Sequence, residues 1–337
     1  MIRLSFVIPC YNVERFVLEC LDSIFSCDIP ENEYEVICVN DCSTDETGQI
    51  LNNRLSVHPN LRVINLPVNK GPGAARNAGI KEARGTFLWF IDADDFISGQ
   101  RLNAIIKDAA ADDVDVLCFN YRKTDEGGKE LSTYNVFSKV SPINGYSFVN
   151  TVFGSTIVFH MGYAVRFIFK VDYLKSRRLL FPEGVIWEDT VYMPKALLKA
   201  SRVASIPDIL YSYRTNPASI SNIYIKSYPA KLIYDWSFVT GKELLDFSDE
   251  VEDSNLKEAF KRSAINKYIN GFSLLLFRTN QSERKAFYKI VKKARKEVDI
   301  IRGELTPINR LLLSPVGFPI ASLGAIIYKF THRNRYA

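Results

Sequence analysis

Short apolar runs alternate with amphipathic stretches through the first 121 residues of this 337-residue chain. Each run is too short for a helix and fits a strand buried on both faces, whereas the stretches between them repeat apolar residues at helical spacing. Strands are expected at residues 4–8, 35–39, 62–66, 87–91 and 114–121, and helices at 16–24, 43–55, 74–83 and 101–110. This order predicts a mostly parallel α/β sheet with helices on both faces.

Two of these helices have recognisable start signals. Asn12 is available as the N-cap of the first helix, and Ser43-x-x-Glu46 has the spacing of a capping box for the second. The pattern loosens after residue 121, where the polar segment 122–135 predicts a hairpin or loop. A further helix is expected at 191–198, and the periodicity is mostly helical from about residue 228.

Charge is unevenly distributed along the chain. The net charge is +5, but residues 281–337 alone carry 12 Lys or Arg and 4 Asp or Glu, a balance of +8 against −3 for the rest. The ordinary composition excludes extended disorder and disulfide scaffolds, and the slightly acidic main body argues against a nucleic-acid partner. Six cysteines without Cys-x-x-Cys spacing, and a start without a signal-peptide pattern, predict an unsecreted protein with reduced thiols.

Acidic residues follow the strand expected at 87–91. Asp92, Asp94 and Asp95 emerge where that apolar run ends, at the sheet edge where α/β proteins bind ligands. Carboxylates crowded there repel each other, and a divalent cation such as Mn²⁺ or Mg²⁺ would offset that repulsion. Taken alone, the same residues also fit a turn with solvated acids.

Polar residues also follow the first two strands. Pro9, Tyr11 and Asn12 come after the first, and Asp41 after the second. Asp41 is either an Asx-turn residue or an acceptor for a nucleobase N–H, with the Tyr11 ring packing nearby. From this segment alone, the turn is the simpler interpretation.

A glycine-containing segment precedes the helix expected at 74–83. Gly71-x-Gly73 is not a dinucleotide fingerprint, because Arg76 replaces the third glycine and the segment does not follow the first strand. Lys70 and Arg76 could meet a phosphate at the positive end of the helix. They could equally be two solvated cations at a helix start.

Two carboxylates, Glu188 and Asp189, follow Trp187 just before the helix expected at 191–198. Acids there can serve the helix dipole, or one can accept a proton from a sugar hydroxyl. Arg214 lies on a later strand and loop that could close over a site, although it also fits a surface ion pair.

Taken together and in order, these segments resemble the family 2 glycosyltransferases with the GT-A fold. The resemblance is carried by SFVIPCYN (5–12), VNDCSTDETG (39–48), NKGPGAARNAG (69–79), FIDADD (90–95), WED (187–189) and YRTNPASIS (213–221). It implies a catalytic domain at 1–225, with a nucleotide-sugar half at 1–121 and an acceptor half at 122–225. A mainly helical region would follow at 226–337.

The resemblance also implies roles for individual residues. Pro9, Tyr11, Asn12 and Asp41 would hold the nucleobase side of a nucleotide sugar, expected to be a UDP-sugar, and Lys70, Arg76 and Asp92 would complete the donor site. Asp92 and Asp94 would bind the metal, and Asp189 would be the general base of an inverting transfer. The remaining polar residues are candidates for acceptor contacts or a lid: Asp95, Trp187, Glu188 and Arg214.

The C-terminal sequence predicts contact with a membrane. Residues 284–302 are basic and amphipathic, and residues 311–330 carry Lys329 as their only charge. That length suits a spanning helix, but Pro315 and Pro319 break it into pieces that better fit an interfacial anchor. The alternative is that the segment packs on the catalytic domain as ordinary core.

We therefore expect a cytoplasmic enzyme at the cytoplasmic face of a membrane, acting on a saccharide or lipid-linked acceptor in cell-surface polysaccharide synthesis. A sugar nucleotidyltransferase is one alternative, because such enzymes also combine a metal with an α/β sheet. Its usual glycine-rich basic loop after the first strand is missing. A non-catalytic, membrane-associated nucleotide-binding protein is the other, and the full set of acidic site residues speaks against it.

Overall fold

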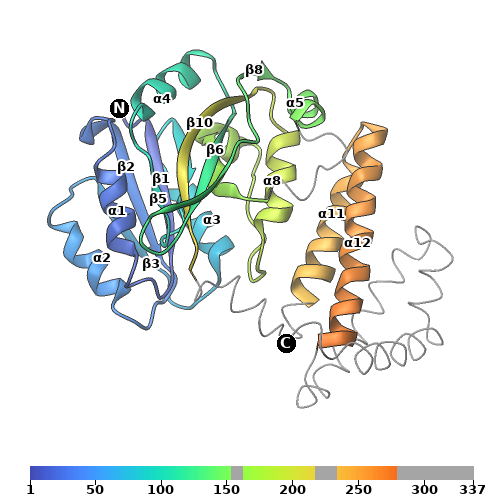
Figure 1. Ribbon diagram of the computed structural model, residues 1–337, viewed down its shortest axis with the longest axis horizontal. Helices are drawn as coiled ribbons and strands as arrows, with labels where there is room; N and C mark the ends of the chain where they lie inside the picture. The colour runs from blue at the N-terminus through green and yellow to red at the C-terminus, as the bar shows by residue number, and fades with distance from the viewer. Residues whose placement is uncertain (153–161, 217–233, 279–337) are drawn as a thin grey trace. The chain divides into compact units, whose positions relative to one another are not determined.

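The computed structural model describes residues 1–152, 162–216 and 234–278, and the chain divides into two compact units, Met1–Pro217 and Ala218–Ala337 (Figure 1). The basic and apolar segments predicted to meet a membrane, 284–302 and 311–330, lie outside the described residues. None of the helices in the described part is both long and apolar enough to cross a membrane.

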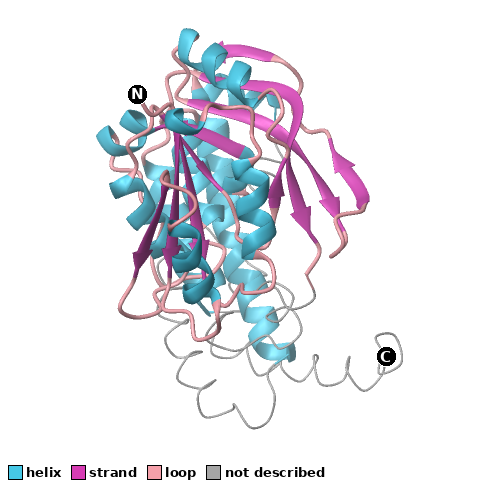
Figure 2. Ribbon diagram, turned by 90° about the vertical axis from the view of Figure 1, so that its left-hand side faces the viewer, coloured by secondary structure: helices cyan, strands magenta, loops and turns pink. Residues whose placement is uncertain are grey.

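The first unit is built on one sheet, whose strands fan out in Figure 2. Its order is β3-β2-β1-β4-β9-β6-β10-β5, with β7 added to β6 and β8 to β10. Strands β1 to β4 are parallel where they pair, as are β6 and β10, while β9 runs antiparallel between β4 and β6. The strands are β1 (Leu4–Cys10), β2 (Tyr34–Asn40), β3 (Leu61–Asn65), β4 (Phe87–Phe90), β5 (Phe96–Ile97), β6 (Val116–Thr124), β7 (Glu130–Tyr134), β8 (Val140–Ile143), β9 (Phe167–Lys170) and β10 (Val203–Arg214).

Helices cover both faces of this sheet. Apolar residues of α1 and α4 join Phe6 and Trp89 in one core cluster, while Gly79 of α3 packs against Val7 on the opposite face. The helices of this unit are α1 (Val17–Phe25), α2 (Thr47–Leu55), α3 (Pro72–Glu82), α4 (Leu102–Ala111), α5 (Gly145–Val152), α7 (Val171–Ser176) and α8 (Asp189–Leu198), with 3₁₀ turns at Glu31–Glu33 and Ala164–Arg166.

The described part of the second unit is helical. A π-helical turn, Asp235–Val239, leads into α11 (Thr240–Asp249), and α12 (Ser254–Arg278) follows. Phe247 of α11 meets Phe260 of α12 edge to face, with ring centroids 5.6 Å apart. This agrees with the helical periodicity expected from about residue 228.

Both predicted helix caps are wrong. Helix α1 begins after Phe16 and α2 after Glu46, and neither helix start has a capping side-chain hydrogen bond. The Asn12 side chain instead accepts a hydrogen bond from the Thr44 backbone N–H at 2.8 Å, and Ser43 Oγ accepts one from the Asn12 N–H at 3.2 Å. These residues join the loops after β1 and β2 to each other rather than starting helices.

The six cysteines are free thiols, as expected for a protein kept reduced. Four of them are buried, at positions 10, 20, 38 and 118. Burial raises the pKa of the Cys20 and Cys118 thiols, which keeps them protonated and unreactive.

Candidate functional site

The polar loops predicted to form a site start at one edge of the sheet. Parallel register places Cys10 of β1 beside Asn40 of β2, and Val7 beside Phe90 of β4. The loops that follow these three strands therefore emerge together, at the end where α/β proteins bind ligands. Tyr11 is 40% exposed in the first loop, whereas Asp41 in the second is buried.

Asp41 connects this edge to the start of α3. Its Oδ1 accepts a hydrogen bond from the Lys70 N–H at 2.8 Å, and its Oδ2 accepts one from the Gly71 N–H at 2.7 Å. Gly71 has φ 84°, a left-handed backbone conformation that favours glycine. A glycine therefore suits the position whose N–H bonds to Asp41. Asp41 therefore shapes the loop that carries Lys70, and its nucleobase role stays a prediction.

Arg76 of α3 is not a solvated cation. Its side chain is buried, and its guanidinium pairs with Asp92 Oδ1 at 2.7 Å and with Glu188 Oε1. The Phe181 ring lies 5.3 Å from the guanidinium carbon. Burial alone lowers the pKa of Arg76, but these carboxylates outweigh it and hold that pKa above its ordinary value. The Arg76 Nε–H is buried and has no hydrogen-bond partner in the described residues.

The three aspartates after β4 have different surroundings. Asp95 is buried, and its carboxylate accepts hydrogen bonds from the Tyr211 hydroxyl and from the Arg214 N–H at 2.7 Å. Asp92 and Asp94 remain partly exposed. Burial and the charge of Asp92 raise the pKa of Asp94 to about 6, against a lowering hydrogen bond from Asn216.

This arrangement fits a divalent cation at Asp92 and Asp94. Burial raises the pKa of Asp94 most and the neighbouring charge of Asp92 adds to it, and a bound cation would offset the repulsion between these two carboxylates. Hard oxygen ligands of this kind suit Mn²⁺ or Mg²⁺. The described residues contain no group of three or more His, Cys, Asp or Glu that could hold an ion, so other ligands would come from the donor or water.

Strand β10 holds the Asp92–Asp94 segment from the side. The Tyr211 hydroxyl accepts a hydrogen bond from the Asp92 N–H at 3.3 Å, and Arg214 Nε donates to the Asp94 carbonyl at 2.9 Å. Arg214 is buried, and its guanidinium carbon lies 5.4 Å from the ring centroid of Phe16 and 5.1 Å from that of Phe96. These contacts support the acidic loop, and a role of Arg214 in acceptor binding or a lid stays a prediction.

Asp189 is the first residue of α8 and has unusual electrostatics. Its Oδ1 is buried and has no hydrogen-bond partner among the described residues. Burial and the charge of Glu188 raise the pKa of Asp189 well above its ordinary value, although Arg76 acts in the opposite direction. Trp187, two residues before Asp189, has φ 58°, and its carbonyl accepts a hydrogen bond from the Thr190 N–H, which turns the chain into the helix. Such a carboxylate is a stronger base than an ordinary aspartate.

Sequence reasoning missed Tyr211 and Asn216, which contact the acidic loop from β10 and its end. Tyr211 lies on β10 and Asn216 within the motif at 213–221, but neither position indicates which loop it meets. Their only signal was proximity to Arg214 in the sequence. The contact joins residues more than 100 positions apart.

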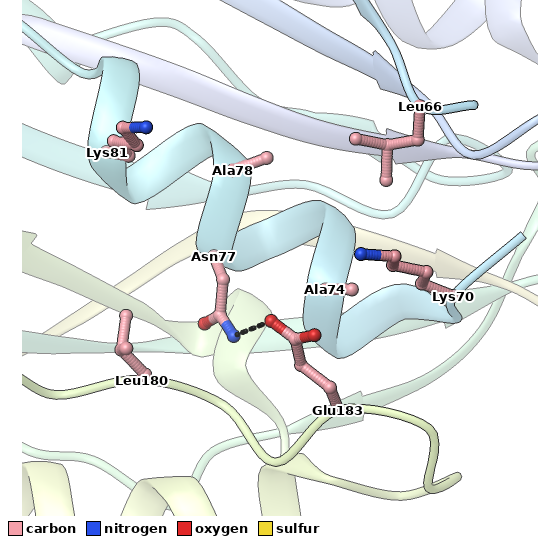
Figure 3. Close-up of a pocket in the computed structure, with 8 residues that line it drawn as sticks. All are labelled: Leu66, Lys70, Ala74, Asn77, Ala78, Lys81, Leu180 and Glu183. Carbon is pink, nitrogen blue, oxygen red and sulfur yellow. Dashed lines mark hydrogen bonds between the residues drawn. The ribbon is translucent and has the colours of Figure 1, made fainter. Parts of the chain in front are cut away.

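A pocket of about 440 Å³ runs along the outer face of α3 (Figure 3). Lys70, in the loop held by Asp41, lies at one end of the pocket. Across from it, Asn77 Nδ2 donates a hydrogen bond to Glu183 Oε1 at 3.2 Å. The lining residues are Leu66, Lys70, Ala74, Asn77, Ala78, Lys81, Leu180 and Glu183.

Residues 5–174 match the family described as Glycosyl transferase family 2. The chain is 32% identical over 287 residues to the poly(ribitol-phosphate) beta-N-acetylglucosaminyltransferase TarS of Staphylococcus aureus strain MW2, covering 81% of this chain and 46% of that protein. It is 30% identical to the poly(ribitol-phosphate) beta-glucosyltransferase of Bacillus spizizenii, covering 80% and 40%. The chain thus spans about half the length of these curated relatives.

The solved structure of S. aureus TarS residues 1–349 with UDP-GlcNAc superimposes with a TM-score of 0.68 at 22% identity, covering 100% of this chain and 93% of that one. This likeness confirms the predicted GT-A type α/β fold. Together with the family match over half of the sequence, it leads to one conclusion: the chain belongs to glycosyl transferase family 2.

Proposed function

We propose that this protein is an inverting glycosyltransferase of cell-surface polysaccharide synthesis, which moves a sugar from a UDP-sugar to an acceptor hydroxyl. The relatives named above are, by their names, poly(ribitol-phosphate) glycosyltransferases, and one of them is solved with UDP-GlcNAc. The acceptor class we propose is therefore a saccharide or a polyol phosphate chain, free or lipid-linked. The observation that carries the proposal is the buried Oδ1 of Asp189, which has no hydrogen-bond partner among the described residues, beside the Arg76, Asp92 and Glu188 cluster.

Each residue of the cluster has a distinct task in this mechanism. Asp189 accepts the proton of the acceptor hydroxyl, whose oxygen attacks the anomeric carbon from the face opposite the leaving group. The bond from that carbon to the diphosphate breaks, UDP departs with the electron pair, and the configuration inverts. Arg76 stabilises the charge that develops on the departing diphosphate.

A divalent cation held by Asp92 and Asp94 would supply further charge neutralisation at the diphosphate. Asp95, Tyr211 and Arg214 keep the backbone of those two acids in place through the hydrogen bonds described above. On the donor side, Asp41 and Lys70 fix the loop before α3, Pro9 lies near the end of β1, and Tyr11 and Asn12 lie in the loop that follows it. We assign these residues to the nucleoside.

The test is a screen of nucleotide sugars with Mn²⁺, with and without a ribitol phosphate oligomer as acceptor. Release of UDP together with sugar transfer supports the proposal. Release of pyrophosphate would instead indicate a nucleotidyltransferase, and nucleotide binding without turnover of any donor would indicate a non-catalytic protein. Chelation should abolish metal-dependent donor binding, and Asp94→Ala should do the same.

We also propose that the C-terminal region brings the enzyme to the cytoplasmic face of a membrane. The support is the sequence alone: a basic amphipathic stretch at 284–302 and an apolar stretch at 311–330. Basic residues attract anionic headgroups, and an apolar segment broken by prolines fits the interface.

A further inference from the structure

Four tyrosines and a lysine form a surface that the mechanism above does not use. Strand pairing places Tyr121 of β6 opposite Tyr134 of β7, and Lys123 of β6 opposite Tyr213 of β10. Residues paired in this way point to the same face of a sheet. The rings of Tyr121 and Tyr134 stack with centroids 4.7 Å apart and planes 5° from parallel. We call Tyr121, Lys123, Tyr134, Tyr163 and Tyr213 the tyrosine platform.

The platform extends toward Asp189 through Tyr163. The Tyr163 ring lies 6.1 Å from that of Tyr121 and is 46% exposed. Its neighbour Gly162 packs on the first turn of α8, because a Cβ added there would lie 3.3 Å from Thr190 Cγ2. The charge of Asp189 also contributes, after burial, to a raised pKa of Tyr163. One end of the platform is thus close to the proposed base.

Lys123 provides the positive charge of this surface. Its Nζ lies 5.5 Å from the ring centroid of Tyr134 and 5.7 Å from that of Tyr213. No carboxylate of the described residues lies within ion-pair distance of it, whereas the nearby Glu130 pairs with Arg122. The rings attract the ammonium by cation–π interaction, and Lys123 also hydrogen-bonds to the Tyr134 side chain, which leaves its other N–H donors for another group.

The chemistry of this surface suits a polyol phosphate. Sugar and polyol C–H groups carry partial positive charge and pack on the negative faces of aromatic rings. Tyrosine hydroxyls can hydrogen-bond to polyol oxygens, and a lysine is a common point-charge partner for phosphate. Exposed rings beside an ammonium therefore match a chain in which polyol units alternate with phosphates.

We propose that the tyrosine platform is the acceptor subsite, with polyol units on the exposed rings of Tyr134 and Tyr163 and a phosphate on Lys123. Bound in this way, an acceptor presents a hydroxyl toward Asp189. The inference rests on the proposed function and adds the residues that recognise the acceptor, together with its charge.

Direct binding of two probes tests the proposal on the full chain in the presence of UDP. The probes are a ribitol phosphate oligomer and a neutral oligosaccharide of similar length. Lys123→Gln should weaken binding of the ribitol phosphate oligomer by about tenfold, the effect of losing one charge-assisted contact, and leave the neutral probe unaffected. Tyr163→Ala and Tyr134→Ala should weaken binding of both probes. The matched control is Lys107→Gln, an exposed lysine of α4, which should change neither.

The outcomes separate this inference from the function on which it rests. If the Lys123 and tyrosine variants bind the oligomer as the Lys107 variant does, the subsite is wrong, even when UDP-sugar turnover shows that the enzyme assignment is right. An equal loss for both probes in Lys123→Gln would overturn the phosphate contact. If no donor is turned over while the oligomer still binds through Lys123, the function fails and the binding surface stands. UDP affinity and melting temperature, measured for every variant, report whether the donor half is intact.

Discussion

The surroundings of Asp189 in the folded protein disfavour the charged form of its carboxylate. Its pKa is raised by burial, and its Oδ1 lacks a hydrogen-bond partner in the described residues, so the charged form is destabilised in the folded protein. Asp189→Asn should therefore raise the melting temperature at neutral pH while it lowers turnover by about 10² or more. Thermal unfolding and steady-state kinetics on the same preparation measure both effects.

Asp172→Asn is the matched control, since Asp172 is also an acidic residue in the first turn of a helix but is exposed. That variant should lose a small amount of stability through the helix dipole and keep full turnover. UDP affinity should be unchanged in Asp189→Asn. Wild-type turnover in Asp189→Asn would remove this residue from the role of base.

The same electrostatics predict the pH dependence of turnover. A general base acts when deprotonated, so kcat should fall as pH drops through the pKa of Asp189, which lies above that of an ordinary aspartate. Glu188→Gln removes the neighbouring charge that helps to raise this pKa, so the acidic limb of the profile should move to lower pH. Profiles of kcat at saturating substrate measure the shift, and an unmoved limb would contradict the assignment.

At the scale of elements, the close approach of α3 to β1 positions Arg76. A Cβ added at Gly79 would lie 2.1 Å from Val7 Cγ1, so Gly79→Ala should push the helix away from the strand. We expect a loss of about 1–3 kcal/mol in the free energy of unfolding, as in other overpacked cores, together with weaker donor binding. Denaturant unfolding and UDP titration measure the two effects.

Gly127→Ala is the control, because its added Cβ would meet only Asp125 Oδ1 at an ordinary 3.5 Å. Combining Gly79→Ala with Val7→Ala removes the two methyl groups in the way, so the double variant should lose less than the sum of the single losses. Strict additivity would mean that the helix and strand do not compete for this space.

Elements with local signals were predicted well from the sequence, and those that depend on distant partners were not. The expected strand at 35–39 and helix at 74–83 differ from β2 and α3 by a residue or two at each end, because hydrophobic period defines them locally. The caps at Asn12 and Ser43 failed because each residue found a partner in the other loop. Strand β9, which pairs antiparallel between β4 and β6, depends on non-local contacts that no local pattern encodes.

The candidate site also combines features that the sequence predicts locally with features that depend on distant contacts. Asp92, Arg76 and Asp189 are visible as motif residues, but the ion pairs of Arg76 with Asp92 and Glu188 join three separate segments. The motifs also do not show that the Asp95 carboxylate accepts hydrogen bonds from within the protein. Its donors, Tyr211 and Arg214, come more than 100 residues later in the sequence. The sequence shows that carboxylates are present in these motifs. The tertiary contacts show which of them are already engaged in hydrogen bonds or ion pairs.

At the scale of the whole molecule, the distribution of charge has a consequence for location. The balance of +8 in residues 281–337 stands beside −3 in the rest of the chain, so a purely electrostatic attraction to anionic lipid would come from the C-terminal region. Exposed charges are screened within about 10 Å at 0.1 M salt, so such binding should weaken as salt rises.

Vesicle cosedimentation tests this, with anionic and neutral vesicles at low and high salt. The full chain should bind anionic vesicles in low salt and partly dissociate in high salt, with the apolar stretch at 311–330 retaining a fraction. Deleting residues 305–337 should remove the salt-resistant fraction, and replacing Lys292, Lys293 and Lys296 with glutamine should remove much of the salt-sensitive one. An unchanged UDP affinity in both variants would show that the catalytic unit is intact. Equal partitioning of the full and shortened chains would mean that the apolar stretch packs within the protein and that the membrane is not its partner.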